Sequence, residues 1–191
     1  GRDGLATGAT DNYGVVGGGA GNQAGHGAGE VSDAGAATVA GGWLNRALGE
    51  IATVAGGAEN TAAAEGAAIG GGASNTIEIS GTMAAIGGGQ FNLATGWAAT
   101  VSGGEDNQAT GNNATVGGGA ANLAGDWAAT VAGGAENQAW GTASTVGGGG
   151  QNAAGINAVV AGGWSNAAAA TDSAVGGGNS AQGDDILISA L

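Results

Sequence analysis

The sequence has no proline, no cysteine and no lysine, and its basic side chains are limited to Arg2, Arg46 and the single histidine, His26. Fifteen acidic residues stand against the two arginines, which gives a formal net charge of −13. Such a charge repels phosphate backbones and anionic lipid heads, so we expect no nucleic-acid partner. No run of about 18 apolar residues occurs, so we expect no membrane insertion.

Glycine, in contrast, is abundant, with 47 residues that follow a strict period. Each repeat has a valine or isoleucine, which we call the anchor, then one small residue and then Gly-Gly. The anchors, most of them 15 residues apart, are Val16, Val39, Val54, Ile69, Ile86, Val101, Val116, Val131, Val146, Val160 and Val175. A fixed period of this length predicts a solenoid, in which each repeat buries its apolar face against its neighbours.

Asparagine lies six residues after the anchor in ten of the eleven repeats. These residues are Asn22, Asn45, Asn60, Asn75, Asn92, Asn107, Asn122, Asn137, Asn152 and Asn166. In stacked coils they would form a structural ladder of amide hydrogen bonds rather than a ligand site. We interpret the last repeat as shortened, with Asn179, Ala181 and Gly183 in the places of Asn, Ala and Gly.

A 15-residue unit suits one coil with two short strands and two turns. Side chains alternate between the two faces of a strand, so Ala52 and Val54 would point inward and Thr53 outward. We therefore expect an all-β fold, a single-stranded parallel β-solenoid (β-roll) of about eleven 15-residue coils. It would form one domain over residues 1–191, with a lead-in or cap at 1–15, repeats at 16–183 and an apolar strand or cap at 184–191.

The pattern resembles the head repeats of YadA-like trimeric autotransporter adhesins. Residues 129–133, Ala-Thr-Val-Ala-Gly, match the first half of that repeat, and residues 137–141, Asn-Gln-Ala-Trp-Gly, match the second, with Asn in place of Ser. The resemblance covers about residues 14–183, with a period one residue longer than in the adhesins. It implies a left-handed parallel β-roll, usually trimeric, on a bacterial surface or phage fibre.

Catalytic chemistry has little support in the sequence. His26 lies near Glu30 and Asp33 in the one large insertion, where a solvated loop is a better interpretation than a metal site. The residue before each ladder asparagine varies, which argues against a calcium-binding repeat. We expect no enzyme activity, no metal and no cofactor.

Two sets of outward residues are candidates for contacts. A threonine column forms a candidate flat interaction face: Thr38, Thr53, Thr100, Thr115, Thr130 and Thr145. Tryptophans too large for so narrow a core are candidate aromatic contacts: Trp43, Trp97, Trp127 and Trp164, with Trp140 apart from them. Each set also has an alternative interpretation without a partner. Threonine can recur because it favours exposed strands, and tryptophan can serve only to cover glycine-rich turns.

The ends suggest how copies could meet. An unpaired apolar strand recruits partners, so Ile186, Leu187, Ile188 and Leu191 form a candidate assembly edge. Each coil offers only a small Val and Ala core, which favours burial of a further face against other copies. The insertion between Val16 and Val39 predicts a loop that protrudes at residues 25–33.

From these observations we expect a non-enzymatic, extracellular or cell-surface structural protein, adhesin-like, that self-associates into a trimer or a head-to-tail fibre. Its expected partners are further copies of itself and a host or abiotic surface. The alternative is an ice-binding protein that uses the flat Thr, Ala and Gly face.

Overall fold

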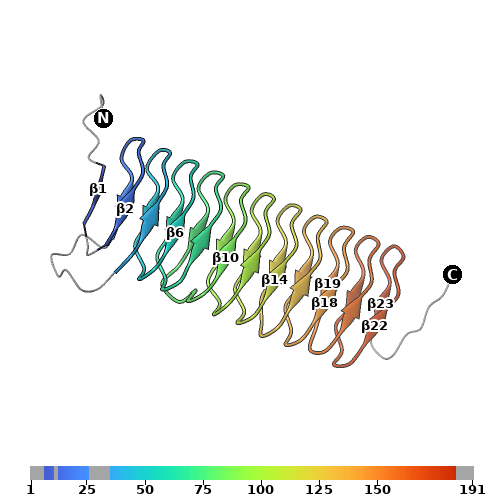
Figure 1. Ribbon diagram of the computed structural model, residues 1–191. Helices are drawn as coiled ribbons and strands as arrows, with labels where there is room; N and C mark the ends of the chain where they lie inside the picture. Colours follow the sequence, from blue (N-terminus) through green and yellow to red (C-terminus); the bar gives the residue numbers. More distant parts are fainter. Residues whose placement is uncertain (1–6, 11–12, 26–34, 184–191) are drawn as a thin grey trace. The chain divides into compact units, whose positions relative to one another are not determined.

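The computed structural model describes residues 7–10, 13–25 and 35–183. These residues form strands, turns and bends without a helix, so the predicted all-β parallel solenoid of about eleven coils is confirmed. The coils fall into two compact units, Gly1–Ala98 and Ala99–Leu191. Within each unit, successive coils stack in sequence order (Figure 1).

Every strand is two residues long. In the first unit the strands are β1 (Gly8–Ala9), β2 (Val15–Val16), β3 (Gln23–Ala24), β4 (Thr38–Val39), β5 (Arg46–Ala47), β6 (Thr53–Val54), β7 (Thr61–Ala62), β8 (Ala68–Ile69), β9 (Thr76–Ile77), β10 (Ala85–Ile86) and β11 (Leu93–Ala94). In the second unit they are β12 (Thr100–Val101), β13 (Gln108–Ala109), β14 (Thr115–Val116), β15 (Leu123–Ala124), β16 (Thr130–Val131), β17 (Gln138–Ala139), β18 (Thr145–Val146), β19 (Ala153–Ala154), β20 (Val159–Val160), β21 (Ala167–Ala168), β22 (Ala174–Val175) and β23 (Gln182–Gly183).

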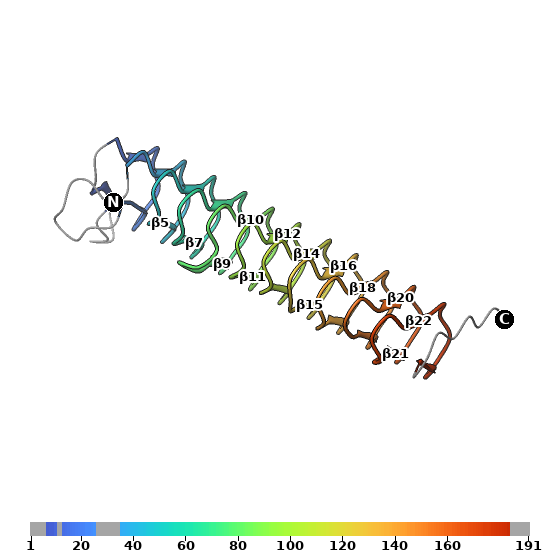
Figure 2. The same ribbon diagram turned by 90° about the horizontal axis from the view of Figure 1, so that it is seen from below.

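The strands form two parallel sheets in each unit, one from the odd-numbered and one from the even-numbered strands. In the second unit the two sets lie on opposite sides of the coils (Figure 2). Pairing keeps the repeat in register, so that Thr115 lies beside Thr130 and Val116 beside Val131. From β3 to β22, the second residue of each strand is buried, and these residues form the core: the anchors from Val39 to Val175 on the even-numbered strands, and alanine, or Ile77 in β9, on the odd-numbered strands.

The second glycine of the Gly-Gly pair is required by the close approach of the next coil in the pairs before Gly178. Gly134 has a φ of 92°, and a Cβ there would lie 2.1 Å from the carbonyl oxygen of Gly149 and 2.7 Å from Nδ2 of Asn137. No L side chain fits this corner without displacement of the neighbouring backbone.

Two further positions in each coil have left-handed backbone, and nearly all of them hold residues other than glycine. They lie three residues before and five residues after the anchor, with φ from 52° to 62° at residues such as Ile51, Glu59 and Ala128. At both positions the backbone N–H donates to a carbonyl of the preceding coil, as Ile51 does to Gly35 at 2.9 Å and Glu59 does to Trp43 at 2.8 Å. These corners therefore bond neighbouring coils together.

The interpretation of the last repeat as shortened is wrong. Gln182 and Gly183 pair with Ala167 and Ala168, which places Ala181 opposite Asn166 and Asn179 opposite Trp164. The repeat keeps its normal length up to Gly183, and the asparagine position simply holds alanine. The Ala181 N–H still donates to Oδ1 of Asn166, at 2.9 Å.

Part of the expected lead-in is already solenoid, since Gly8 and Ala9 pair with Gln23 and Ala24. The protruding loop predicted at residues 25–33 and the assembly edge of Ile186, Leu187, Ile188 and Leu191 fall, apart from Gly25, outside the described residues. His26, Glu30 and Asp33 lie outside them as well.

Candidate functional surfaces

The ten ladder asparagines are buried and hydrogen-bonded from coil to coil within each unit. Nδ2 of Asn137 donates to the carbonyls of Gly133 in its own coil and Gly149 in the next, both at 3.0 Å. Its backbone N–H and Nδ2 both donate to Oδ1 of Asn122, at 3.0 and 3.1 Å. The amides thus hold the Gly-Gly corners in place.

Within the described residues, no buried side-chain nitrogen or oxygen lacks a hydrogen-bond partner. The interior therefore consists of apolar side chains, the ladder amides and two serines, Ser144 and Ser173, with every buried polar side chain hydrogen-bonded. The side-chain polar groups that remain open to a partner therefore lie on the outer surface.

The outward residues of the even-numbered strands and the exposed small residue after each anchor form the surface that we call the flat face. In the second unit its central column runs Thr100, Thr115, Thr130, Thr145, Val159 and Ala174. In the first unit, Thr38 and Thr53 continue into Ala68 and Ala85. The structure thus places the predicted threonines side by side in each unit, and the exposed residue after each anchor is Gly, Ala or Ser.

Charge is absent from the flat face. Every charged residue in the described part of the chain lies outside the even-numbered strands and outside the three residues after them: Arg46, Glu50, Glu59, Glu65, Glu78, Glu105, Asp106, Asp126, Glu136 and Asp172. A protein with a net charge of −13 thus keeps an uncharged face along each of its units.

The five tryptophans lie at corners of the coils and are about half exposed, between 44 and 54 %. Trp43 and Trp164 each occupy the position directly after Gly-Gly, where single-residue bridges link neighbouring coils. Trp97 and Trp127 each lie four residues before an anchor.

Some large corner side chains pack over glycine in a neighbouring coil. A Cβ on Gly150 would lie 2.2 Å from the Trp164 ring, and one on Gly155 would lie 3.2 Å from the Trp140 ring. Met83 covers Gly66 in the same way, at 2.6 Å. Trp140 and Trp164 therefore each cover a glycine of a neighbouring coil with part of the side chain, and about half of each side chain is exposed to solvent.

A polar pair at one corner was not foreseen from the sequence. Oδ1 of Asp126 accepts the backbone N–H of Trp127 at 2.7 Å, and Oδ2 accepts the Thr142 hydroxyl at 2.9 Å. These two hydrogen bonds, the first more than the second, lower the pKa of Asp126 from its ordinary value. Only the stacking register brings Thr142 beside Asp126, so residue spacing alone gave no signal for the pair.

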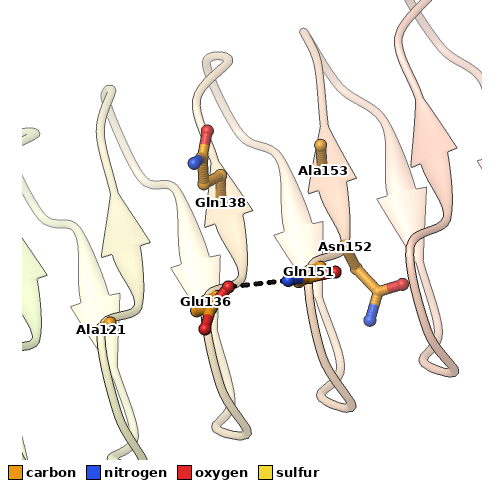
Figure 3. A pocket seen from close by; sticks show the side chains of 6 residues that line it. All are labelled: Ala121, Glu136, Gln138, Gln151, Asn152 and Ala153. Atoms are coloured by element: carbon orange, nitrogen blue, oxygen red, sulfur yellow. Dashed lines mark hydrogen bonds between the residues drawn. The ribbon is translucent and has the colours of Figure 1, made fainter.

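The second unit also has an open hollow of about 360 Å³ on the outer side of the odd-numbered strands (Figure 3). It lies over the small residues Ala121 and Ala153, and Glu136 at its rim accepts a 2.8 Å hydrogen bond from Gln151. Among the residues that line this hollow, Glu136 alone has a titratable side chain. Over the described part of the chain, no three His, Cys, Asp or Glu residues gather as a metal site would need, and no helix of membrane-spanning length and hydropathy occurs.

No model of a known protein family matches the sequence, and no curated protein matches it. The likeness to YadA-like head repeats therefore stands on the coil pattern alone. The solenoid coils are present, whereas membership of that adhesin family is not shown.

Proposed function

We propose that this chain is a non-enzymatic structural element of an extracellular or cell-surface protein, adhesin-like, that self-associates through its flat face. The observation that carries the proposal is the absence of charge from that face in a strongly acidic chain. Copies with a charge of −13 repel one another, and they repel least where no carboxylate lies at the contact.

The composition of the flat face supports the same proposal. Glycine, alanine, serine and threonine let two backbones approach closely, and the threonine hydroxyls can pair with one another across the contact. The face is narrow, so we expect association that is reversible and rises with protein concentration. A trimer and a longer fibre are both compatible with it.

Sedimentation analysis over a range of concentrations tests this proposal. Thr115→Glu with Thr130→Glu adds two charges to the flat face and should shift the chain to monomer. Gln108→Glu with Gln138→Glu adds the same charge to β13 and β17 on the opposite sheet and should leave assembly intact. A monomeric parent chain, or equal loss of assembly in both variants, would overturn the proposal.

Ice binding is the second candidate, and the flat face favours it as well. Regular, uncharged rows of threonine methyls and hydroxyls, spaced about 4.8 Å apart along the stack, offer a rigid periodic surface. Thermal hysteresis in the parent chain that disappears in the Thr115→Glu, Thr130→Glu variant and persists in the β13 and β17 variant would support ice binding. A parent chain without hysteresis would exclude it.

A further inference from the structure

Three successive corners of the second unit, each leading from an odd-numbered to the next even-numbered strand, carry large exposed apolar side chains. Trp127, Trp140 and Ile156 are 54, 46 and 45 % exposed. The corners follow one another along the stack, because the Ala143 N–H donates to the Trp127 carbonyl at 2.8 Å and the Asn157 N–H donates to the Thr142 carbonyl at 2.8 Å. We call this surface the tryptophan edge.

The Trp127 backbone and the Trp140 ring are both held in place. The Trp127 backbone is bonded on both sides, by its N–H to Asp126 and by its carbonyl to Ala143. The Trp140 N–H donates to the Ala154 carbonyl at 3.1 Å, and the Trp140 ring lies against Gly155. A ligand that binds at the edge would therefore find the corner backbone and the Trp140 ring already ordered.

Polar groups lie beside the rings. Each oxygen of the Asp126 carboxylate accepts one hydrogen bond within the protein and can accept another from a ligand. Thr142 and Asn157 add a hydroxyl and an amide on the next two corners. The edge therefore combines flat apolar surfaces with hydrogen-bond acceptors and donors at their margins.

The charge of the second unit limits which class of ligand the tryptophan edge can bind. The second unit contains no lysine or arginine, so nothing on the edge would attract an anionic polymer. A second copy of this chain would bring its own carboxylates against Asp126. A neutral pyranose meets neither obstacle, because one face of its ring presents C–H groups for the indole and its rim presents hydroxyl donors for the carboxylate.

We propose that the tryptophan edge binds neutral, extended polysaccharides, with pyranose rings stacked on Trp127 and Trp140 and a hydroxyl donated to Asp126. The β-1,4-linked chains of glucose or N-acetylglucosamine fit best, since their rings form a flat ribbon that can follow consecutive corners. This site is separate from the flat face, so it does not depend on self-association.

Titration of the whole chain with cellohexaose and with N-acetylchitohexaose, followed by NMR of the indole N–H groups, tests the site. We expect at least one of the two sugars to shift the Trp127 and Trp140 signals selectively. Trp127→Ala should weaken binding at least about tenfold, and Trp127→Phe should recover part of the loss. Trp164→Ala, at an equally exposed corner of the same unit, should bind as the parent does.

Several outcomes would overturn the proposal. They are no shift with either sugar, equal loss of binding in the Trp127→Ala and Trp164→Ala variants, or binding of an anionic hyaluronan oligosaccharide as tight as that of the neutral sugars. Circular dichroism of each variant confirms that the coils are intact, and sedimentation separates a failure of this site from a failure of assembly.

Discussion

Individual residues in this solenoid tolerate backbone conformations that their side chains disfavour. Left-handed corners recur twice per coil, and most are held by residues such as Ala, Ser or Glu rather than glycine. The hydrogen bond that each corner N–H makes to the preceding coil offsets the strain. Among the residues at these corners, Ile51 carries the most backbone strain, because its β-branched side chain crowds its own backbone at a φ of 52°.

Replacement of Ile51 by asparagine should therefore stabilise the chain. Asparagine adopts the left-handed conformation readily, and Ile51 is half exposed, so little packing is lost. We expect a gain of about 1 kcal/mol in the free energy of unfolding, measured by urea denaturation. Ile79→Asn, at a more exposed site with ordinary backbone, is the control and should bring no gain. A loss of stability in Ile51→Asn would contradict the strain argument.

Asp126 should make the stability of its corner depend on pH. Its pKa in the folded chain lies below the ordinary value, so its hydrogen bonds stabilise the fold above about pH 4 and are lost as the pH falls through the folded pKa. The parent should be more stable than Asp126→Asn at pH 7, and the difference should fade in strong acid. Urea denaturation at a series of pH values measures it, with Asp172→Asn as the control for the loss of one charge. A difference that does not change with pH would refute the argument.

The coil is the element from which the fold is built, and its two glycines have different roles. Gly134 lies with positive φ against the next coil, whereas a Cβ on Gly133 would have its nearest neighbour 3.9 Å away. Gly134→Ala should lower the free energy of unfolding by more than about 2 kcal/mol, because the backbone of Gly149 must move. Gly133→Ala should change it little. Thermal denaturation of both variants checks the contrast, and equal effects would show that the corner is looser than the structure indicates.

Much of the coil could be predicted from its period. The anchors, the inward alanines, the Gly-Gly corner and the asparagine position all recur, so the strands and the core followed from the spacing. The left-handed corners could not be foreseen, because residues as different as Ile51, Glu59 and Ala128 occupy them. The last repeat was misread because Asn179 offered the expected residue type, while the backbone ladder kept Ala181 in that place.

The surfaces were predictable only in part. Thr115 and Thr130 were recognisable as a column because the period repeats them. The uncharged character of the flat face became clear only once strands and corners were assigned. The Asp126 and Thr142 pair, like the packing of Trp140 on Gly155, depends on contacts between coils that residue type does not specify.

At the scale of the whole molecule, each unit is a stack of nearly equivalent coils over the described residues, and successive coils within a unit pair strand to strand. In such repeat proteins stability is close to a sum of coil and neighbour terms, so a complete coil can be removed without loss of the fold. Deletion of residues 117–131 joins Val116 to Ala132 and keeps the anchor, the glycine corner and the asparagine ladder in register. We expect an unchanged shape of the circular dichroism spectrum and a modest loss of stability to urea.

Deletion of residues 117–124, the control, joins Val116 to Gly125 and removes a glycine corner and one ladder asparagine, Asn122. That variant should lose far more stability than the longer deletion, since the ladder amides of Asn107 and Asn137 would no longer meet a partner in the adjoining coil. If the shorter deletion were the better tolerated of the two, length rather than register would decide stability, and the equivalence of the coils would be refuted.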